Sequence, residues 1–540
     1  MREHFKNTLW RLALGLTMMA LPTWAQQYHS NDLTPPYSAT GKLQGASKGK
    51  QVGGGGNGHA YLISGNALTA VDLHPVTGYS NSMATSSDDF SQCGYAYSNL
   101  GGIHAMKWSG SNSSYVDLQP SGYNFSYCTG VDGNDQGGFA EQQSYAVTAS
   151  HAMLWHGNSL ATDLHPISFG MLFSRVMGVK AGEEAGYVSN IAYPVGDYLG
   201  YHTSSKAVVW HGTPDSAVNL HPLGYDSSEA LATNGTQQGG WAYRLVDNAT
   251  HAMLWNGTAD TAVDLHPAGY TATKINAIIG SQQVGEGWVG VPGAIGSVRH
   301  ALLWNGTADT VVDLNQYLPT GYTNGVATGM DADGNVVGFA YNTLAQGLYL
   351  GGDVIAVVFA PGPAPASSLS AITVDNATVA PGGTLNATVT LTSAAPAGGV
   401  NITFLSTNTA LAGTPDPATI VEGATSVTVP VQVLGSTLTT PTSFKLYASD
   451  NIATRNVLVT IKPVVKLSSV SMNSVEGGLS TTGTIVLTIP AQVGGAAVSL
   501  TSSDPHLVLP ATITLPQGYT ALSFAATTTP VTVLTPVTVT

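Results

Sequence analysis

Five histidine–aspartate pairs recur through the first two-thirds of the chain. In each pair an aspartate follows a histidine by twelve or thirteen residues, and the histidine begins a short apolar motif, as in His251-Ala-Met-Leu-Trp255. The pairs are His59 and Asp72, His104 and Asp117, His151 and Asp163, His251 and Asp264, and His300 and Asp313. A histidine bonded to a carboxylate can act as a general base, but only where a nucleophile lies beside it. Because a pair in most repeats cannot build one active site, we interpret the pairs as structural hydrogen bonds.

One repeat changes both partners together. Where the histidine is replaced by Lys206, the aspartate is replaced by Asn219. This paired change favours a direct contact between the two positions. If the two strands are joined by a two-residue Gly257-Thr258 loop, His251 lies directly across from Asp264, whereas an Asn256-Gly257 loop places them diagonally.

The remaining polar clusters favour turns over metal or catalytic sites. Four histidines each precede a proline: His74, His165, His221 and His266. A zinc site requires ligands that converge on one ion, and one histidine per repeat keeps them apart. The segment Asp331-Ala-Asp-Gly-Asn335 resembles a calcium loop, but its glycine is fourth instead of sixth, so a turn is the better interpretation.

The carboxylate doublet Glu183-Glu184 does not suggest a glycosidase. Two carboxylates must face one glycosidic bond, while neighbours on a strand point to opposite faces. We therefore predict no catalytic residue, no cofactor and no metal site. A hydrolase or lyase acting on polysaccharide, and a structural surface protein without a ligand, are the alternatives to a binding protein.

The motifs belong to longer repeats. A small-residue strand, a turn and a second strand precede each HAxLW motif, and a DL strand follows it. Units start near Leu43, Ala84, Thr129, Met177, Leu231, Ile275 and Val326, and the recurring histidine or its replacement falls at 59, 104, 151, 206, 251, 300 and 346. Four short strands at this period, apolar on both faces, predict a seven-bladed β-propeller over residues 26–361.

A ring of repeats must close. Tyr28–Pro35 resembles the DLHP strand and could complete the last blade from the N-terminus, while Val354–Pro361 could complete it in sequence. We favour the N-terminal segment and expect residues 30–36 to pair with the seventh unit, because Asn31-Asp-Leu-Thr-Pro matches the repeat better.

HAxLW followed by DL, with GxxxxGxxVG turns between units, resembles the HAF-type extracellular repeat of secreted bacterial proteins. The resemblance covers roughly residues 40–350. It implies secretion and a propeller-like fold, without an enzyme activity or a defined ligand. The unit with Lys206 and Asn219 departs from the pattern, as does the last one at Gln346.

The composition and the first residues favour export. Residues 1–25 have a basic start, the apolar run Leu12–Leu21 and small residues before a cleavage site, which is typical of a signal peptide. The run is too short to span a membrane, so we expect a secreted or cell-surface protein with no membrane insertion after cleavage. A net charge of −14 does not favour nucleic acid as a partner.

Beyond residue 361 the sequence changes. Residues 362–368 form a Pro/Ala linker, and two copies of one pattern follow at 369–463 and 464–540, with few aromatic residues. Their size and strand spacing predict Ig-like β-sandwiches, with a Calx-type sandwich as the alternative. The second copy stops opposite Lys445 of the first and lacks counterparts of Tyr447–Pro463. We expect a fragment, or a final strand supplied by another chain.

Two features remain as candidate sites. Cys93 and Cys128 fall in neighbouring units and are a candidate disulfide in an exported protein, although both also suit buried apolar positions.

The fourth unit along the chain carries an insertion between its second and third strands, and the sixth unit is longer at the same place. We predict that this face binds a glycan or a protein surface, with Tyr193, Tyr198, Tyr201 and His202 as candidate ligand-binding residues. A ring of Gly-Tyr tyrosines on the same face could contribute, or could fill gaps between units.

Overall fold

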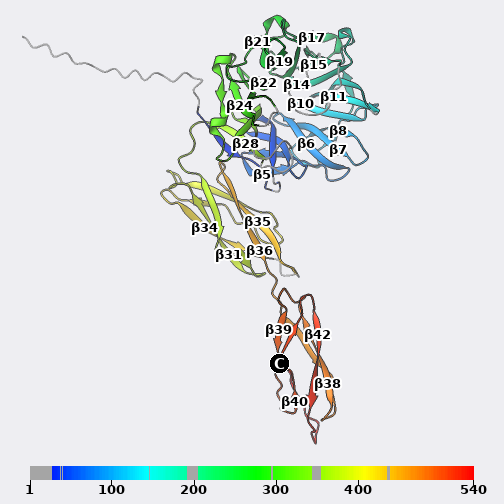
Figure 1. Ribbon diagram of the computed structural model, residues 1–540, viewed down its shortest axis with the longest axis vertical. Helices are drawn as coiled ribbons and strands as arrows, with labels where there is room; N and C mark the ends of the chain where they lie inside the picture. Colours follow the sequence, from blue (N-terminus) through cyan, green and yellow to red (C-terminus); the bar gives the residue numbers. More distant parts are fainter. Residues whose placement is uncertain are drawn as a thin grey trace, which may run out of the picture. The chain divides into compact units, whose positions relative to one another are not determined.

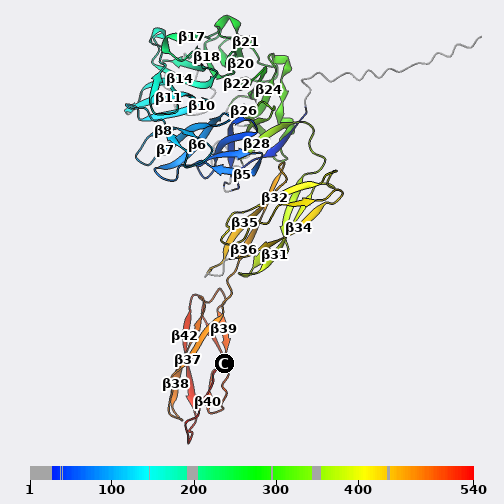
Figure 2. The same cartoon turned by 180° about the vertical axis from the view of Figure 1, so that it is seen from behind.

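The chain folds into two compact all-β units, Met1–Pro365 and Ala366–Thr540 (Figures 1 and 2). The computed structural model describes residues 27–36, 38, 40–144, 146–190, 205–292, 296–342, 354–434, 438 and 440–540. Within these residues the only helical segments are short 3-10 turns: η1 (Ile167–Phe169), η2 (Pro214–Ser216), η3 (Ala259–Thr261), η4 (Ala308–Thr310) and η5 (Leu314–Tyr317). None of them is long and apolar enough to cross a membrane.

The described strands of the N-terminal unit, here called the ring domain, form sheets of 4, 12, 8 and 4 strands. Parallel bridges divide the two larger sheets, so that the domain has seven antiparallel groups of four strands, numbered units 1 to 7. The first strands are β2 (Gly41–Ser47), β6 (Tyr79–Ser87), β10 (Phe125–Asp132), β14 (Phe173–Lys180), β18 (Ser227–Thr233), β22 (Ala272–Ile279) and β26 (Asn324–Met330). The second strands are β3 (Lys50–Gly55), β7 (Gln92–Ser98), β11 (Asp135–Ser144), β15 (Glu183–Ser189), β19 (Gln238–Arg244), β23 (Gln282–Val289) and β27 (Val336–Tyr341). The third strands are β4 (Ala60–Ser64), β8 (Ile103–Trp108), β12 (Ala146–Trp155), β16 (Lys206–Trp210), β20 (Ala249–Trp255), β24 (Val298–Trp304) and β28 (Val354–Pro361). The fourth strands are β5 (Asn66–Asp72), β9 (Val116–Asp117), β13 (Ala161–Asp163), β17 (Val218–Asn219), β21 (Val263–Asp264), β25 (Val312–Asp313) and β1 (Tyr28–Asp32).

Unit 7 is completed by both segments that the sequence offered. Its third strand is β28, and the N-terminal β1 pairs with it antiparallel as the fourth strand, with Asp32 opposite Val357. The N-terminal segment therefore pairs with the last unit as expected, although through residues 28–32. The expected histidine position of this unit is wrong: Ala340 pairs with Ile355, as Ala242 pairs with His251 in unit 5. Gln346 lies outside the described residues.

The first strands form a closed circle, since each contacts the first strand of the next unit and β26 contacts β2. Figure 2 shows β6, β10, β14, β18, β22 and β26 following one another around a common centre. Small residues permit this close approach: a Cβ on Gly178 would lie 3.0 Å from the Cα of Ala232, and one on Gly329 would lie 3.1 Å from the Cα of Gly45.

Apolar residues from neighbouring units pack against one another. In one cluster Ala105 and Leu118 of unit 2 meet Met153 and Trp155 of unit 3. The tryptophans that end the third strands are fully buried: Trp108, Trp155, Trp210, Trp255 and Trp304. A single unit could not cover both of its apolar faces, so each unit needs its neighbours to bury them.

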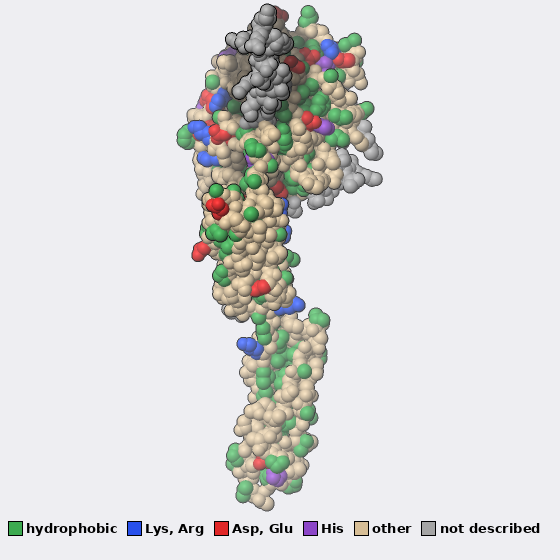
Figure 3. Space-filling model, turned by 90° about the vertical axis from the view of Figure 1, so that its left-hand side faces the viewer, with side chains coloured by type: hydrophobic (Ala, Val, Ile, Leu, Met, Phe, Trp, Pro, Cys, Tyr) green, Lys and Arg blue, Asp and Glu red, His purple; other side chains and the backbone are tan. Residues whose placement is uncertain are grey.

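The C-terminal unit contains two modules. In the first, a sheet of β29 (Leu369–Val374), β31 (Thr384–Leu391) and β34 (Ser426–Gln432) shares one apolar core with a sheet of β30 (Thr378–Val379), β36 (Thr454–Ile461), β35 (Thr442–Ser449), β32 (Val400–Ser406) and β33 (Ala418–Ile420). In the second, β37 (Leu467–Met472), β38 (Ser480–Leu487), β42 (Ala521–Thr528) and β40 (Leu507–Val508) form one sheet, and β39 (Ala496–Ser499) and β41 (Thr512–Leu515) form the other. Few charged side chains lie on the face of this unit that Figure 3 shows.

Candidate functional site

The structure brings all five predicted histidine–aspartate pairs together. The histidine Nδ1 lies 2.6–2.7 Å from an aspartate Oδ2 in every pair. The contact is diagonal, because Asp264 pairs in register with Met253, two residues beyond His251. Neither of the two-residue loops considered from the sequence is present, since the connection contains η3.

In four of the five pairs, a tyrosine from the preceding connection contacts the aspartate or the histidine. The hydroxyls of Tyr79 and Tyr225 donate to Asp117 and Asp264, both at 2.9 Å, and that of Tyr270 donates to Asp313 at 3.4 Å. Tyr123 instead contacts His151 Nδ1, at 3.3 Å. Burial and the nearby carboxylate raise the pKa of Tyr79, Tyr225 and Tyr270. The Gly-Tyr tyrosines therefore fasten one unit to the next. We call each tyrosine–aspartate–histidine set a joint.

The histidines before proline extend the joints. Their Nδ1 atoms lie 2.8–2.9 Å from a serine or threonine hydroxyl at the start of the next unit: Ser82, Ser174, Ser228 and Thr273. Three of their rings pack against a repeat histidine with centroids 4.1–4.3 Å apart. Burial, and then the neighbouring histidine, lowers the pKa of His74, His165 and His266. No group of three metal-ligating side chains converges among the described residues.

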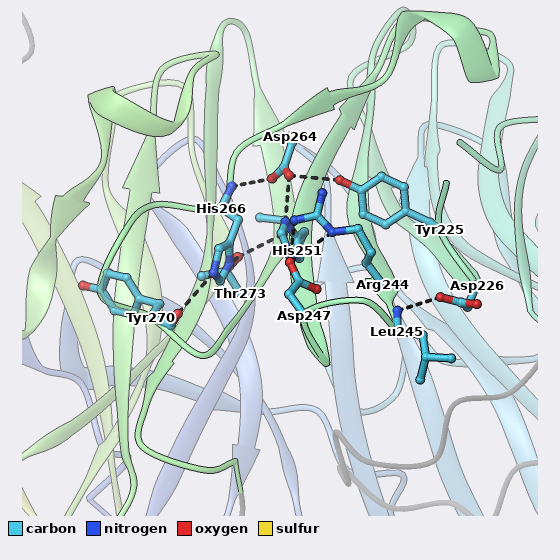
Figure 4. A network of polar contacts seen from close by, with 11 residues as sticks. Tyr225, Asp226, Arg244, Leu245, Asp247, His251, Asp264, His266, Tyr270 and Thr273 are labelled. Atoms are coloured by element: carbon cyan, nitrogen blue, oxygen red, sulfur yellow. Dashed lines mark hydrogen bonds and ion pairs between the residues drawn. The ribbon is translucent and has the colours of Figure 1, made fainter. Parts of the chain in front are cut away.

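Unit 5 has the most extensive joint (Figure 4). His251, which is 3% exposed, contacts Asp264 through Nδ1 at 2.7 Å and Asp247 through Nε2 at 3.1 Å. Arg244 Nε donates to Asp247 at 3.0 Å. Burial raises the pKa of Asp264, but the hydrogen bonds from His251 and the His266 N–H outweigh it and hold that pKa below its usual range. The imidazole is thus fixed between two carboxylates.

Unit 4 lacks this joint. Phe169 replaces the tyrosine, Lys206 the histidine and Asn219 the aspartate. Asn219 keeps one role, accepting the His221 N–H at 2.9 Å. Lys206 begins β16 directly after the insertion, and no hydrogen bond or ion pair joins its ammonium group to another described residue. The predicted ligand-binding residues Tyr193, Tyr198, Tyr201 and His202 lie outside the described residues.

Asp331 and Glu184, two carboxylates considered in the sequence as possible site residues, both accept hydrogen bonds from backbone N–H groups. Asp331, which is 1% exposed, accepts hydrogen bonds from the N–H groups of Gly49, Asp333 and Asn335, so its oxygens face donors and not a cation.

Glu184 occupies a position that is glutamine in other units and accepts the Gly212 N–H at 2.8 Å. The glutamines at this position each accept an equivalent N–H: Gln92, Gln136, Gln238 and Gln283. Burial raises the pKa of Glu184 to about 7.

The two cysteines are unbridged thiols in this structure. Cys93 and Cys128 are both completely buried in the apolar cluster between units 2 and 3. Burial, and then a hydrogen bond with Cys93, raises the pKa of the Cys128 thiol. The positions are adjacent as the candidate disulfide requires, but the thiols occupy them as small buried groups.

The two ends of the ring domain differ in their exposed apolar side chains. The loop face carries the connections between second and third strands and between units, and the turn face carries the other turns. Among the described residues of the domain, ten large apolar side chains are at least three-fifths exposed. Eight lie on the loop face: Val76, Leu100, Ile167, Leu172, Leu223, Leu245, Val246 and Val291. Phe90 and Leu160 lie on the turn face.

A cavity of about 560 Å³ lies inside the circle of first strands, which all contribute to its wall. Each first strand contains a β-bulge, at the same place in the repeat. The bulged residues are Gln44, Thr85, Thr129, Met177, Leu231, Asn276 and Thr328, and all line the cavity. The sequence pattern predicted the histidine–aspartate contacts but neither this wall nor the tyrosine contacts of the joints. The simultaneous change at Phe169, Lys206 and Asn219 was the available signal for the joints.

No family model matches this chain. No curated protein matches it either. Among solved structures, it is similar to the tricorn protease (8% identity, TM-score 0.33, covering 87% of this chain and 46% of that one). It is also similar to puromycin hydrolase (10% identity, TM-score 0.30, covering 60% and 52%) and to an Escherichia coli alpha-2-macroglobulin activated by porcine elastase (10% identity, TM-score 0.18, covering 94% and 50%). The chain thus spans about half of each, and likeness at these TM-scores carries no argument about fold or activity.

Proposed function

We propose that the protein is a secreted or cell-surface binding protein that attaches to another protein's surface through the loop face of the ring domain. In this proposal the seven units are blades of a seven-bladed β-propeller related to the HAF-type extracellular repeat. Residues 1–25 are a signal peptide, and the two C-terminal modules are Ig-like spacers.

The distribution of exposed apolar side chains carries the proposal. Among the described residues of the ring domain, eight of the ten well-exposed apolar side chains lie on the loop face. An excess of exposed apolar groups on one end of a domain is consistent with a protein interaction site there. They are mostly aliphatic, which suits a protein partner better than a sugar, whose recognition relies on aromatic platforms.

Features of unit 4 also favour the loop face as the binding surface. Its connections hold Ile167, Leu172 and Leu223, and Leu223 is fully exposed. At this rim Lys206 stands where five other units carry the histidine of a histidine–aspartate pair. By contrast, the histidines and aspartates that could do chemistry are held in joints, which favours binding over catalysis.

The double variant Ile167→Asp/Leu223→Asp tests this proposal. Full-length protein and the variant are compared for retention on intact bacterial cells and on a panel of immobilised extracellular proteins. We expect retention to fall at least tenfold, because two charges enter an apolar contact. The matched control Leu160→Asp alters an equally exposed side chain on the turn face and should change retention less than twofold. Equal effects of the two changes, or cleavage of polysaccharide by the purified protein, would contradict the proposal.

A further inference from the structure

The cavity inside the circle of first strands is a second candidate site, distinct from the loop face. Its volume of about 560 Å³ falls within the range of small-molecule sites. The wall is formed by the later half of each first strand and by the turn that follows, so the cavity lies toward the turn face.

One side of the cavity wall is polar, and its side chains donate hydrogen bonds to the backbone of the next unit. Thr85, Thr129 and Thr328 donate their hydroxyl hydrogens to backbone carbonyls of the next unit, at 2.7–2.9 Å. Asn276 donates to the Ala327 carbonyl at 2.8 Å. These hydrogen bonds fix the neighbouring strands and use the donor hydrogens, so each hydroxyl or amide oxygen retains lone pairs that can accept a further hydrogen bond.

The other side of the wall is apolar. In units 4 and 5 the bulged residues are Met177 and Leu231, which cannot donate a hydrogen bond. Val179 and Ile278 continue this wall. A ligand that fits both sides therefore has one apolar face and one edge of hydroxyl donors.

The charged groups near the cavity are already paired. Asp88 accepts the N–H groups of Phe90, Ser91 and Gly133 at 2.6–2.7 Å. Lys180 Nζ lies 2.6 Å from Asp132, and Lys48 pairs with Asp89. Because each carboxylate has a cation or N–H partner, the wall favours a neutral ligand over an ion.

An aromatic side chain stands beside these aspartates. Phe90 lines the cavity and is 81% exposed. An aromatic ring next to hydrogen-bond acceptors suits a sugar, whose C–H face packs on the ring while its hydroxyls bond to polar groups.

We propose that this cavity binds the terminal sugar of a neutral carbohydrate, with Phe90 as the stacking platform and Met177 and Leu231 as the apolar wall. This site lies toward the turn face and does not depend on protein binding at the loop face.

The test uses the full-length chain on a printed array of neutral oligosaccharides, followed by titration calorimetry with the sugar that gives the strongest signal. Phe90→Ala removes the platform, and Leu231→Glu places a charge on the apolar wall. We expect each to weaken binding at least tenfold. Leu160→Glu, on the same face but outside the cavity, and Leu223→Asp, on the loop face, should change it less than twofold.

Three outcomes would overturn the proposal. The first is an array on which no neutral sugar binds. The second is unchanged affinity of Phe90→Ala, which remains decisive if Leu231→Glu fails to fold, because Phe90 is exposed. The third is a loss of sugar binding in Leu223→Asp alone, which would place the sugar on the loop face. The protein-retention assay of the loop face is separate, so the two proposals can fail independently.

Discussion

Units 4 and 5 share one backbone pattern but differ in the polar chemistry that holds them. Both contain four antiparallel strands, a buried tryptophan and a bulged first strand. Unit 5 has the complete joint of Tyr225, Asp264 and His251, whereas unit 4 has none. The difference teaches that apolar packing is sufficient to form a unit, and that the joint is an added stabilisation. A unit without the joint can use the same rim for another purpose.

The largest effect is expected for Asp264→Ala. This change removes the acceptor of the His251 imidazole, the Tyr225 hydroxyl and the His266 N–H. We expect the free energy of unfolding of the ring domain to fall by about 3–4 kcal/mol. Tryptophan fluorescence in denaturant reports this domain alone, since no tryptophan lies beyond residue 304. Asn219→Ala, the matched change in unit 4, should cost about 1 kcal/mol; equal costs would show that the joint adds nothing.

Glu184→Gln tests the same two units at another position. Unit 5 has Gln238 there, while burial raises the pKa of Glu184 in unit 4 from 4.5 to about 7. A raised carboxyl pKa means that the folded state favours the protonated form, so stability is lost as the pH rises from about 4.5 to 7. We expect Glu184→Gln to add about 2–3 kcal/mol at pH 8 and little below pH 4.5. Denaturation curves across this pH range measure it, and a gain that does not depend on pH would contradict the assignment.

His251→Ala is expected to cost about 1–3 kcal/mol, because it leaves Asp264 and Asp247 without their shared partner. Lys206→Ala removes the residue at the same position of unit 4 and should cost less than about 0.5 kcal/mol. Chemical denaturation of the two variants side by side gives the comparison. If both lose the same amount, the histidine contributes only through its packing.

The smallest effect is expected for Tyr225→Phe. The ring remains in place and only its hydrogen bond to Asp264 is lost, which should lower the free energy of unfolding by about 1 kcal/mol. Unit 4 already has a phenylalanine, Phe169, at this position, so the variant should keep its strands and its far-ultraviolet circular dichroism should not change. A loss above about 3 kcal/mol would indicate that Tyr225 supports more than one bond.

Much of the architecture follows from the repeat pattern. The spacing of HAxLW and DL located the third and fourth strands of six units, and it identified the histidine–aspartate contact, because both partners lie in one hairpin. The repeat alignment was wrong in the last unit, because Ile355 and Phe359 occupy the positions that His251 and Trp255 occupy in unit 5. Tyr225 and Asp264 are 39 residues apart and meet only because units pack side by side. The cavity wall also depends on closure of the ring, which local periodicity does not encode.

Tyrosine, aspartate and histidine are expected to form one cooperative joint, whose three residues are all replaced in unit 4. The triple variant Phe169→Tyr/Lys206→His/Asn219→Asp rebuilds the joint in unit 4, and its unfolding free energy is compared with those of the three single variants. We expect the triple variant to be more stable than the sum of the single changes predicts, by about 1–2 kcal/mol. Strict additivity of the three changes, or a triple variant less stable than that sum, would contradict it.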